Sequence, residues 1–161
     1  MILREIDLDE VKEFINAQSP ETCVYLGSDS ERHKIDGRWY ADYTTCVIVH
    51  IDGEHGCKVF GEVKRELDYD QKKNKPSMRL MNEVYNVSAL FSELKDVLED
   101  RYVEVHLDLN PDIRYGSSCV IQQAIGYIRG TCNLTPMVKP NSWARSEEHT
   151  SELQSPMYLV C

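Results

Sequence analysis

The sequence predicts a single α/β domain built around a mixed β-sheet, and three observations support this. Its 161 residues suffice for one hydrophobic core. The strand predicted over 23–29 begins with four residues, 23–26, that are apolar on both alternating faces, as is typical of an inner strand covered on both sides. Farther along, helical and strand patterns alternate, which is typical of parallel strands joined by helices.

The first half of the chain predicts one helix followed by three antiparallel strands. Residues 7–15 place apolar side chains at helical spacing with acids in the first turn, and Pro20 ends this helix. The strand 23–29 comes next, and the polar residues 31–37 predict a loop. Two further strands, with a glycine-containing turn at 52–56 between them, are expected over 43–51 and 57–67.

The second half predicts helices that alternate with strands. The segment 68–76 is too polar to be buried and is expected to be a loop. The expected order over the whole chain is β-β-β-α-β-α-β, so the helices return the later strands parallel to the first. These later elements are a long helix over 77–98, a strand over 103–109, a helix over 117–129 that Gly130 stops, and a strand over 133–138.

The composition excludes some classes of protein. A formal net charge of −9 argues against a protein that coats nucleic acid, but not against a nuclease, whose metal-binding carboxylates are themselves acidic. No apolar run approaches the length that spans a membrane, so we expect no membrane partner.

The cysteines indicate a reducing compartment. All six lie far apart, with no CxxC pair and no signal peptide before them, which predicts reduced thiols in a cytoplasmic protein. His50, His55 and Cys57 are neighbours in sequence, but their spacing fits no common zinc pattern, and a turn explains it better.

Three carboxylates are candidates for a catalytic, metal-ligating site. Asp29 ends the apolar strand between small residues, which leaves room for a metal ion or a phosphate. Asp108 ends the strand 103–109, and if this strand lies parallel beside the first, both aspartates occupy one end of the sheet. Glu83 borders the apolar stripe of the long helix and is expected to face the sheet.

Carboxylates gathered in a half-buried crevice repel one another and take up protons unless a cation is present. Mg²⁺ or Mn²⁺ suits such oxygen ligands and can activate a water for phosphodiester hydrolysis. Each residue also has a structural alternative. Asp29 can cap a turn, Asp108 can cap its strand end through Asn110, and Glu83 can pair with Arg79 at helical spacing.

Basic residues near this site are candidate contacts to RNA or DNA. Between Lys58 and Arg79 there are seven basic residues against four acidic ones, although an ordinary solvated loop is the alternative. The candidate phosphate contacts of this stretch are Lys64, Arg65, Lys72, Lys73 and Lys75. Ser30 beside Asp29 and Lys139 near the end of the domain complete the candidate nucleic-acid-binding set.

Five motifs together resemble the ribonuclease H-like YkuK family of bacteria and phages. They are Gly-Ser-Asp-Ser at 27–30, the helical motif at 79–85, the strand motif at 106–112, Gln-Gln-Ala-Ile-Gly-Tyr at 122–127 and the run 138–144. The resemblance covers nearly everything before residue 145, and the last two motifs are fairly specific to that group.

The resemblance implies a five-stranded mixed sheet whose first three strands are antiparallel, with helices on both faces and a divalent-metal acidic cluster. Asp29 matches the first-strand aspartate of the family, Asp108 the fourth-strand aspartate and Glu83 the helical glutamate. The implied function is a divalent-metal-dependent nuclease acting on RNA, an RNA–DNA hybrid or structured DNA. A non-catalytic binding or assembly module is the alternative, because this superfamily contains both.

The end of the chain departs from the family. Residues 145–155 resemble the translation of a common sequencing adapter, so we expect a domain over 1–144 and an artefactual tail over 145–161, the alternative being a genuine solvated tail. The family carries a further aspartate after its Ser-Trp-Ala motif, and Thr150 falls near that place. We therefore expect this chain to bind metal poorly and to hydrolyse little.

Overall fold

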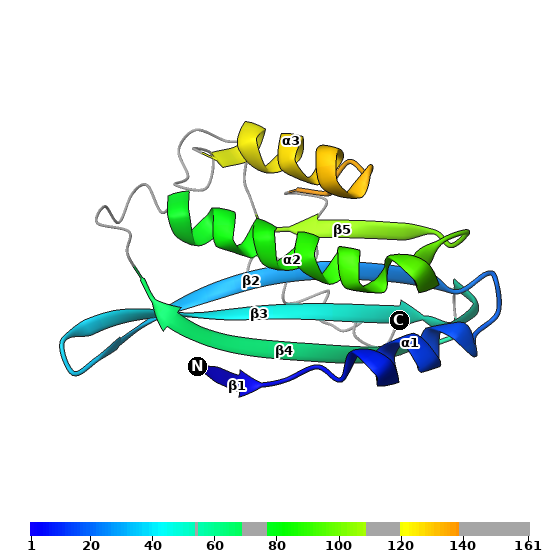
Figure 1. Cartoon of the computed structure of the whole chain (residues 1–161), viewed down its shortest axis with the longest axis horizontal. Helices are drawn as coiled ribbons and strands as arrows, with labels where there is room; N and C mark the ends of the chain where they lie inside the picture. The colour runs from blue at the N-terminus through cyan, green and yellow to red at the C-terminus, as the bar shows by residue number, and fades with distance from the viewer. Residues whose placement is uncertain (54, 69–76, 109–119, 139–161) are drawn as a thin grey trace.

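A computed structural model of the chain describes residues 1–53, 55–68, 77–108 and 120–138, and it confirms the predicted α/β class. Five strands form one mixed sheet in the order β1-β4-β3-β2-β5 (Figure 1). In chain order the elements are β1 (Ile2–Arg4), α1 (Leu8–Asn16), β2 (Cys23–Ile35), β3 (Arg38–His50), the short 3₁₀ helix η1 (Ile51–Gly53), β4 (Cys57–Leu67), α2 (Ser77–Leu98), β5 (Val103–Leu107) and α3 (Ile121–Cys132).

The strand directions are as predicted. β2, β3 and β4 are successive antiparallel neighbours. β5 pairs with β2 in parallel, from Val24 opposite Val103 to Ser28 opposite Leu107. The helical connection through α2 returns the chain to the end of the sheet at which β2 begins, as parallel pairing of β5 with β2 requires. The carboxyl ends of β2 and β5 therefore lie together.

The predicted identity of the fifth strand, residues 133–138, is wrong. β1 takes this place by pairing antiparallel with β4, and its three residues are too few for an alternating pattern to show in the sequence. The expected strand 133–138 is represented, within the described residues, by Met137, which forms a single parallel bridge with His106.

The loop predicted over 31–37 is wrong, because β2 and β3 continue through it as one long hairpin. They pair without interruption to Ile35 opposite Arg38, and Asp36 and Gly37 alone make the turn. Both turn residues have positive φ, 51° and 83°, as two-residue hairpin turns require. Asp-Gly is a strong signal for such a turn, and it explains why the charged flanking residues form strands.

The helices differ from prediction mainly at their ends. α1 begins where expected, and the Oδ1 of Asp7 accepts hydrogen bonds from the backbone N–H groups of Asp9 and Glu10 at 3.1 and 3.2 Å. α2 has the predicted bounds. α3 begins later than expected and continues through Gly130 to Cys132, because Asn133 supplies the left-handed C-cap that was assigned to the glycine.

One core joins the helices to one face of the sheet. Figure 1 shows α2 lying along β2 and β3, and α2 also contacts both α1 and α3. All three described helices contribute buried side chains to this core, so the implied cover of the opposite face, like the predicted boundary at 144, falls outside the described residues. The fully buried members are Val11, Ile15, Val24, Leu26, Val47, Val49, Val84, Val87, Leu94, Val105, Ala124 and Ile128.

Two further predictions concern membranes and cysteines. Within the described parts of the chain, no helix is both long and apolar enough to cross a membrane. Cys23, Cys46 and Cys132 are free thiols, as expected. Cys57 is disulfide-bonded, which corrects the prediction for that residue. It begins β4 at a partly exposed position.

Candidate active site

The candidate site lies where the inner face of β2 changes from apolar to polar. Successive residues of a strand point to opposite faces, so Val24, Leu26, Ser28 and Ser30 all lie on the face that α2 covers. The first two are fully buried in the core. The next two replace apolar side chains with hydroxyls, and the first turns of α2 cross the sheet above them. This end of the core can therefore accommodate polar groups from the helix.

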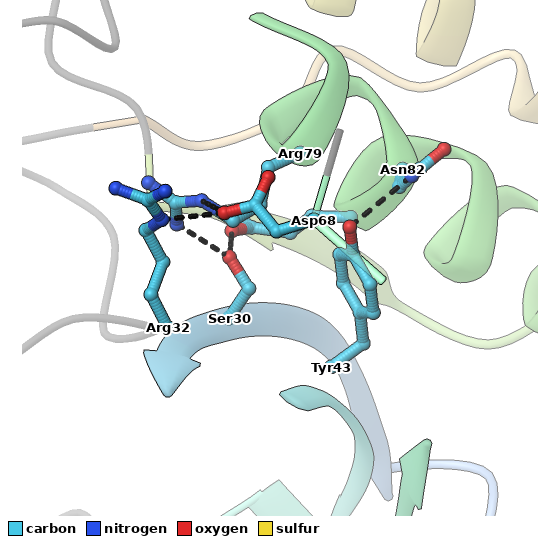
Figure 2. Close-up of polar contacts among 7 residues, drawn as sticks. Ser30, Arg32, Tyr43, Asp68, Arg79 and Asn82 are labelled. Carbon is cyan, nitrogen blue, oxygen red and sulfur yellow. Dashed lines mark hydrogen bonds and ion pairs between the residues drawn. The ribbon is translucent and has the colours of Figure 1, made fainter. Parts of the chain in front are cut away.

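Glu83 is the polar group that α2 places there. It is only 2% exposed, and its Oε2 accepts a hydrogen bond from the hydroxyl of Ser30. Arg79, one turn earlier, donates from its Nη1 to the same serine oxygen at 2.8 Å. Figure 2 shows Ser30 of β2 reaching up to α2 at this point. The prediction that Glu83 faces the sheet is confirmed.

The surroundings of Glu83 raise the pKa of its carboxyl well above the usual range. Burial is the largest cause, and the negative charge of Asp29 is the next. Asp108 raises the pKa further, whereas the Ser30 hydrogen bond and the charge of Arg79 oppose these effects. The charges of both predicted aspartates thus reach Glu83, and the charge of Arg79 offsets them in part.

Asp29 and Asp108 follow the last registered pair of two parallel strands, Ser28 and Leu107, so they lie at one end of the sheet as predicted. Strand alternation places both on the face opposite Ser28, whereas Glu83 approaches from α2. The Oδ1 of Asp29 accepts a hydrogen bond from the backbone N–H of Ser30 at 2.8 Å. On its own face Asp29 acts on Cys46, whose pKa rises to about 12 through burial and then through this charge.

The donor chemistry of the three carboxylates fits a hard divalent cation, because it offers oxygen atoms only and because burial disfavours an uncompensated charge on Glu83. The positions of the side chains match a metal site less well than their donor atoms do. Within the ranges that the structure describes, no group of three or more His, Cys, Asp or Glu side chains is placed to hold a metal ion. His50, His55 and Cys57, which are neighbours in sequence, do not form such a group either.

A buried ion-pair cluster beside Glu83 escaped sequence analysis. The side chain of Asp68 is 1% exposed, and its Oδ2 lies 2.5 Å from the Nε of Arg32 and 3.9 Å from the Nε of Arg79 (Figure 2). Asp68 thus holds Arg79 beside Ser30. Both Asp68 and Arg32 were assigned to loops, and the Asp-Gly turn was the signal that extends β2 and places Arg32 on the face of Ser30.

A second contact fixes α2 on the sheet. The Nδ2 of Asn82 donates to the hydroxyl oxygen of Tyr43 on β3 at 3.1 Å (Figure 2). Tyr43 lies opposite Ser30 in the β2–β3 register. The helix turn that carries Glu83 is therefore attached to two neighbouring strands, which limits the positions that the carboxyl group can take.

The predicted nucleic-acid contacts have different outcomes. Ser30 is part of the Glu83 site. Lys64 lies 3.8 Å from Glu62 and lines a cavity of about 230 Å³ between α2, β4 and the segment after β1. Arg65 donates to both carboxylate oxygens of Asp42, at 2.6 and 2.8 Å, which holds the pKa of Asp42 below its usual value. The candidates outside the described residues are Lys72, Lys73, Lys75 and Lys139.

Comparison with known proteins and the observed fold agree on one family. A family model described as Ribonuclease H-like, which is the YkuK family, matches residues 7–148. Searches of curated proteins and of solved structures found no match. The match spans most of the chain, and the five-stranded sheet with its parallel β2–β5 pair agrees with it. The chain therefore belongs to the ribonuclease H-like family.

Proposed function

We propose that this protein is a divalent-metal-dependent nuclease that hydrolyses phosphodiester bonds in RNA, an RNA–DNA hybrid or structured DNA. The observation that carries the proposal is the burial of Glu83, hydrogen-bonded to Ser30 next to Asp29, at the end of the sheet where Asp29 and Asp108 follow the paired strands β2 and β5. A ribonuclease H-like fold with two aspartates at the carboxyl ends of two parallel strands and a buried glutamate on the covering helix supports hydrolysis better than a structural role.

In this proposal Asp29, Glu83 and Asp108 hold Mg²⁺ or Mn²⁺. When bound, the cation supplies an activated water and stabilises the leaving oxygen. The chain's own residues prepare Glu83 for this role. Ser30 donates to its carboxylate, and Arg79, held in turn by Asp68, fixes the serine hydroxyl. These contacts therefore orient the carboxyl group of Glu83.

The test is hydrolysis of end-labelled RNA, hybrid and branched DNA in Mg²⁺ or Mn²⁺. We expect slow cleavage that a chelator abolishes. Asp29→Asn and Asp108→Asn should each lower the rate by more than about 100-fold, the scale of losing one charge-stabilising group from a transition state. Asp9→Asn, at an exposed position on α1, is the matched control and should cleave as the unaltered chain does. Cleavage that survives Asp29→Asn would overturn the proposal.

A second candidate is a non-catalytic binding module of the same fold. It is favoured by the lack, among the described residues, of three potential ligands placed to hold a metal ion. This candidate predicts nucleic-acid binding that is equal with metal and with chelator, and no cleavage of any labelled substrate. Binding that Asp29→Asn leaves unchanged, together with the lack of cleavage, would favour it over the nuclease.

A further inference from the structure

The outer part of the β2–β3 hairpin, residues 31–42, forms an arm that the proposed hydrolysis does not use. β2 pairs with β5 only as far as Ser28, whereas it pairs with β3 as far as Ile35. In Figure 1 the arm extends past the end of β4 and the start of α2. It therefore reaches outward from the end of the sheet at which Asp29 and Asp108 lie.

One face of this arm combines cations with an aromatic ring. Lys34 is directly opposite Trp39 in the strand register, so these two residues share the face that carries Arg32 and Ser30. The guanidinium carbon of Arg32 lies 4.3 Å from the centroid of the Trp39 ring, and the Nζ of Lys34 lies 5.8 Å from it. The indole remains 37% exposed. We call Arg32, Lys34 and Trp39 the stacking face.

The stacking face is suited to a polyanion that carries flat rings. Proteins bind unpaired nucleic acid by stacking bases on aromatic side chains beside cations that meet the phosphates. Asp68 fixes Arg32 by an ion pair of 2.5 Å, so the residue is ordered before any ligand binds. Of the two cations of the stacking face, Arg32 is paired with Asp68, and Lys34 lies over the Trp39 ring. Lys34 can therefore attract a phosphate in a chain that is acidic overall.

We propose that the stacking face binds an unpaired segment of nucleic acid and directs it toward Glu83. This inference rests on the proposed function for the identity of the polymer. Lys34 and Ser30 are four residues apart on β2, about 13 Å at the rise of a strand, so one short segment can reach both. Bases inside a duplex are already stacked on each other, so the indole selects an unpaired segment.

The experiment measures binding without hydrolysis. The chain contains two tryptophans, so Trp143→Phe leaves Trp39 as the single indole reporter. This background is titrated with a 12-nucleotide single-stranded RNA or DNA in chelator, and indole fluorescence and the dissociation constant are recorded over a range of salt concentrations. We expect saturable quenching of Trp39. A duplex of the same sequence should bind more weakly and quench less.

Variants of the arm separate stacking from charge. In the unaltered Trp143 background, Trp39→Ala should weaken single-strand binding by about 5- to 100-fold, whereas Trp39→Phe, which keeps an aromatic face, should lose less. Lys34→Gln should reduce the slope of log affinity against log salt by about 0.7, the value for one phosphate contact on a single strand.

Two matched controls lie at the far end of the sheet. Tyr102 is an aromatic residue that is 56% exposed before β5, and Lys58 is the second residue of β4, with its Nζ 5.5 Å from the centroid of the Phe60 ring. Tyr102→Ala and Lys58→Gln should both bind as the unaltered chain does. Thermal unfolding of every variant shows whether the fold is retained.

The outcomes distinguish this inference from the proposed nuclease. Unchanged affinity and salt slope in Trp39→Ala and Lys34→Gln would overturn the role of the arm, even if the chain cleaves its substrate. Absence of saturable single-strand binding, or equal binding of the duplex, would overturn it too. Binding through the arm without any cleavage in Mg²⁺ or Mn²⁺ would support the arm and contradict the nuclease.

Discussion

At the scale of single residues, Glu83 is a buried carboxyl group under opposing influences. Burial and two aspartates disfavour its ionised form, while Ser30 and Arg79 favour it. Because the folded-state pKa is raised, the contribution of Glu83 to stability is fully present below the pKa of an unfolded glutamate. That contribution is lost as the pH rises through the folded-state pKa.

Replacing Glu83 by glutamine should therefore raise the stability of the metal-free protein at neutral pH. Glutamine keeps an oxygen for the Ser30 hydroxyl and has no proton to lose. We expect the melting temperature of Glu83→Gln in chelator to exceed that of the unaltered chain at pH 8, by about 2–4 °C for each kcal/mol gained, and the difference to shrink toward pH 4.5. Scanning calorimetry across this pH range measures the effect.

Glu99→Gln is the matched control, because Glu99 is exposed just after α2. Its melting temperature should follow that of the unaltered chain at every pH. A Glu83→Gln difference that is independent of pH would show that the carboxyl group does not titrate as its buried surroundings require.

The sequence indicated the three carboxylates of the candidate site, but not the ion pair between Asp68 and Arg32 beside them. Sequence analysis could identify Asp29 and Asp108 because each follows an apolar strand, and Glu83 because it borders the apolar stripe of a helix. Sequence analysis could not identify Asp68 and Arg32, because their ion pair joins residues 36 positions apart in segments whose composition is that of solvated loops. Only the three-dimensional register brings them together.

At the scale of elements, the β2–β3 hairpin depends on its two-residue turn. Asp36 and Gly37 both have positive φ. Glycine adopts this conformation most easily, and among the other residues asparagine and aspartate adopt it most often. The same hairpin carries Ser30 and Arg32, so the turn helps to set the strand register on which the candidate site depends.

Gly37→Ala should destabilise the protein, because alanine at φ +83° is strained although nothing lies within 4 Å of its methyl group. We expect a loss of about 1 kcal/mol in the free energy of unfolding, measured by urea denaturation.

Gly130→Ala is a control of opposite sign. Gly130 is an exposed glycine within α3 with open space around it, so alanine should stabilise the helix by about 0.5–1 kcal/mol. Equal effects of the two changes would contradict the assigned turn.

Element types were largely predictable, while element lengths were not. The long stripe of α2 and the β-branched runs of β3 and β4 determine helix and strand by their periodicity. The charged residues 31–37 carry no such pattern, and their strands are fixed by the Asp-Gly turn and by pairing across it. β1 is a strand because the edge of β4 is available to it, which no local pattern reports.

At the scale of the whole molecule, the parallel pairing of β2 with β5 connects the fold to the proposed chemistry. It ends both strands at the same place, so two aspartates distant in sequence act on one buried glutamate. The apolar residues of β2 give way to serines at this same end, where α2 crosses the sheet. The fold thereby concentrates negative charge in a protein that is already acidic, and a cation is the simplest means of balancing it.

Calorimetric titration of Mn²⁺ into the protein at neutral pH tests this account most directly. We predict weak, saturable binding to the unaltered chain and to Asp9→Asn, at least about tenfold weaker binding to Asp29→Asn, and competition by Mg²⁺. Equal binding by the unaltered chain and Asp29→Asn, or no saturable binding at all, would contradict the claim that these carboxylates form a divalent-metal site.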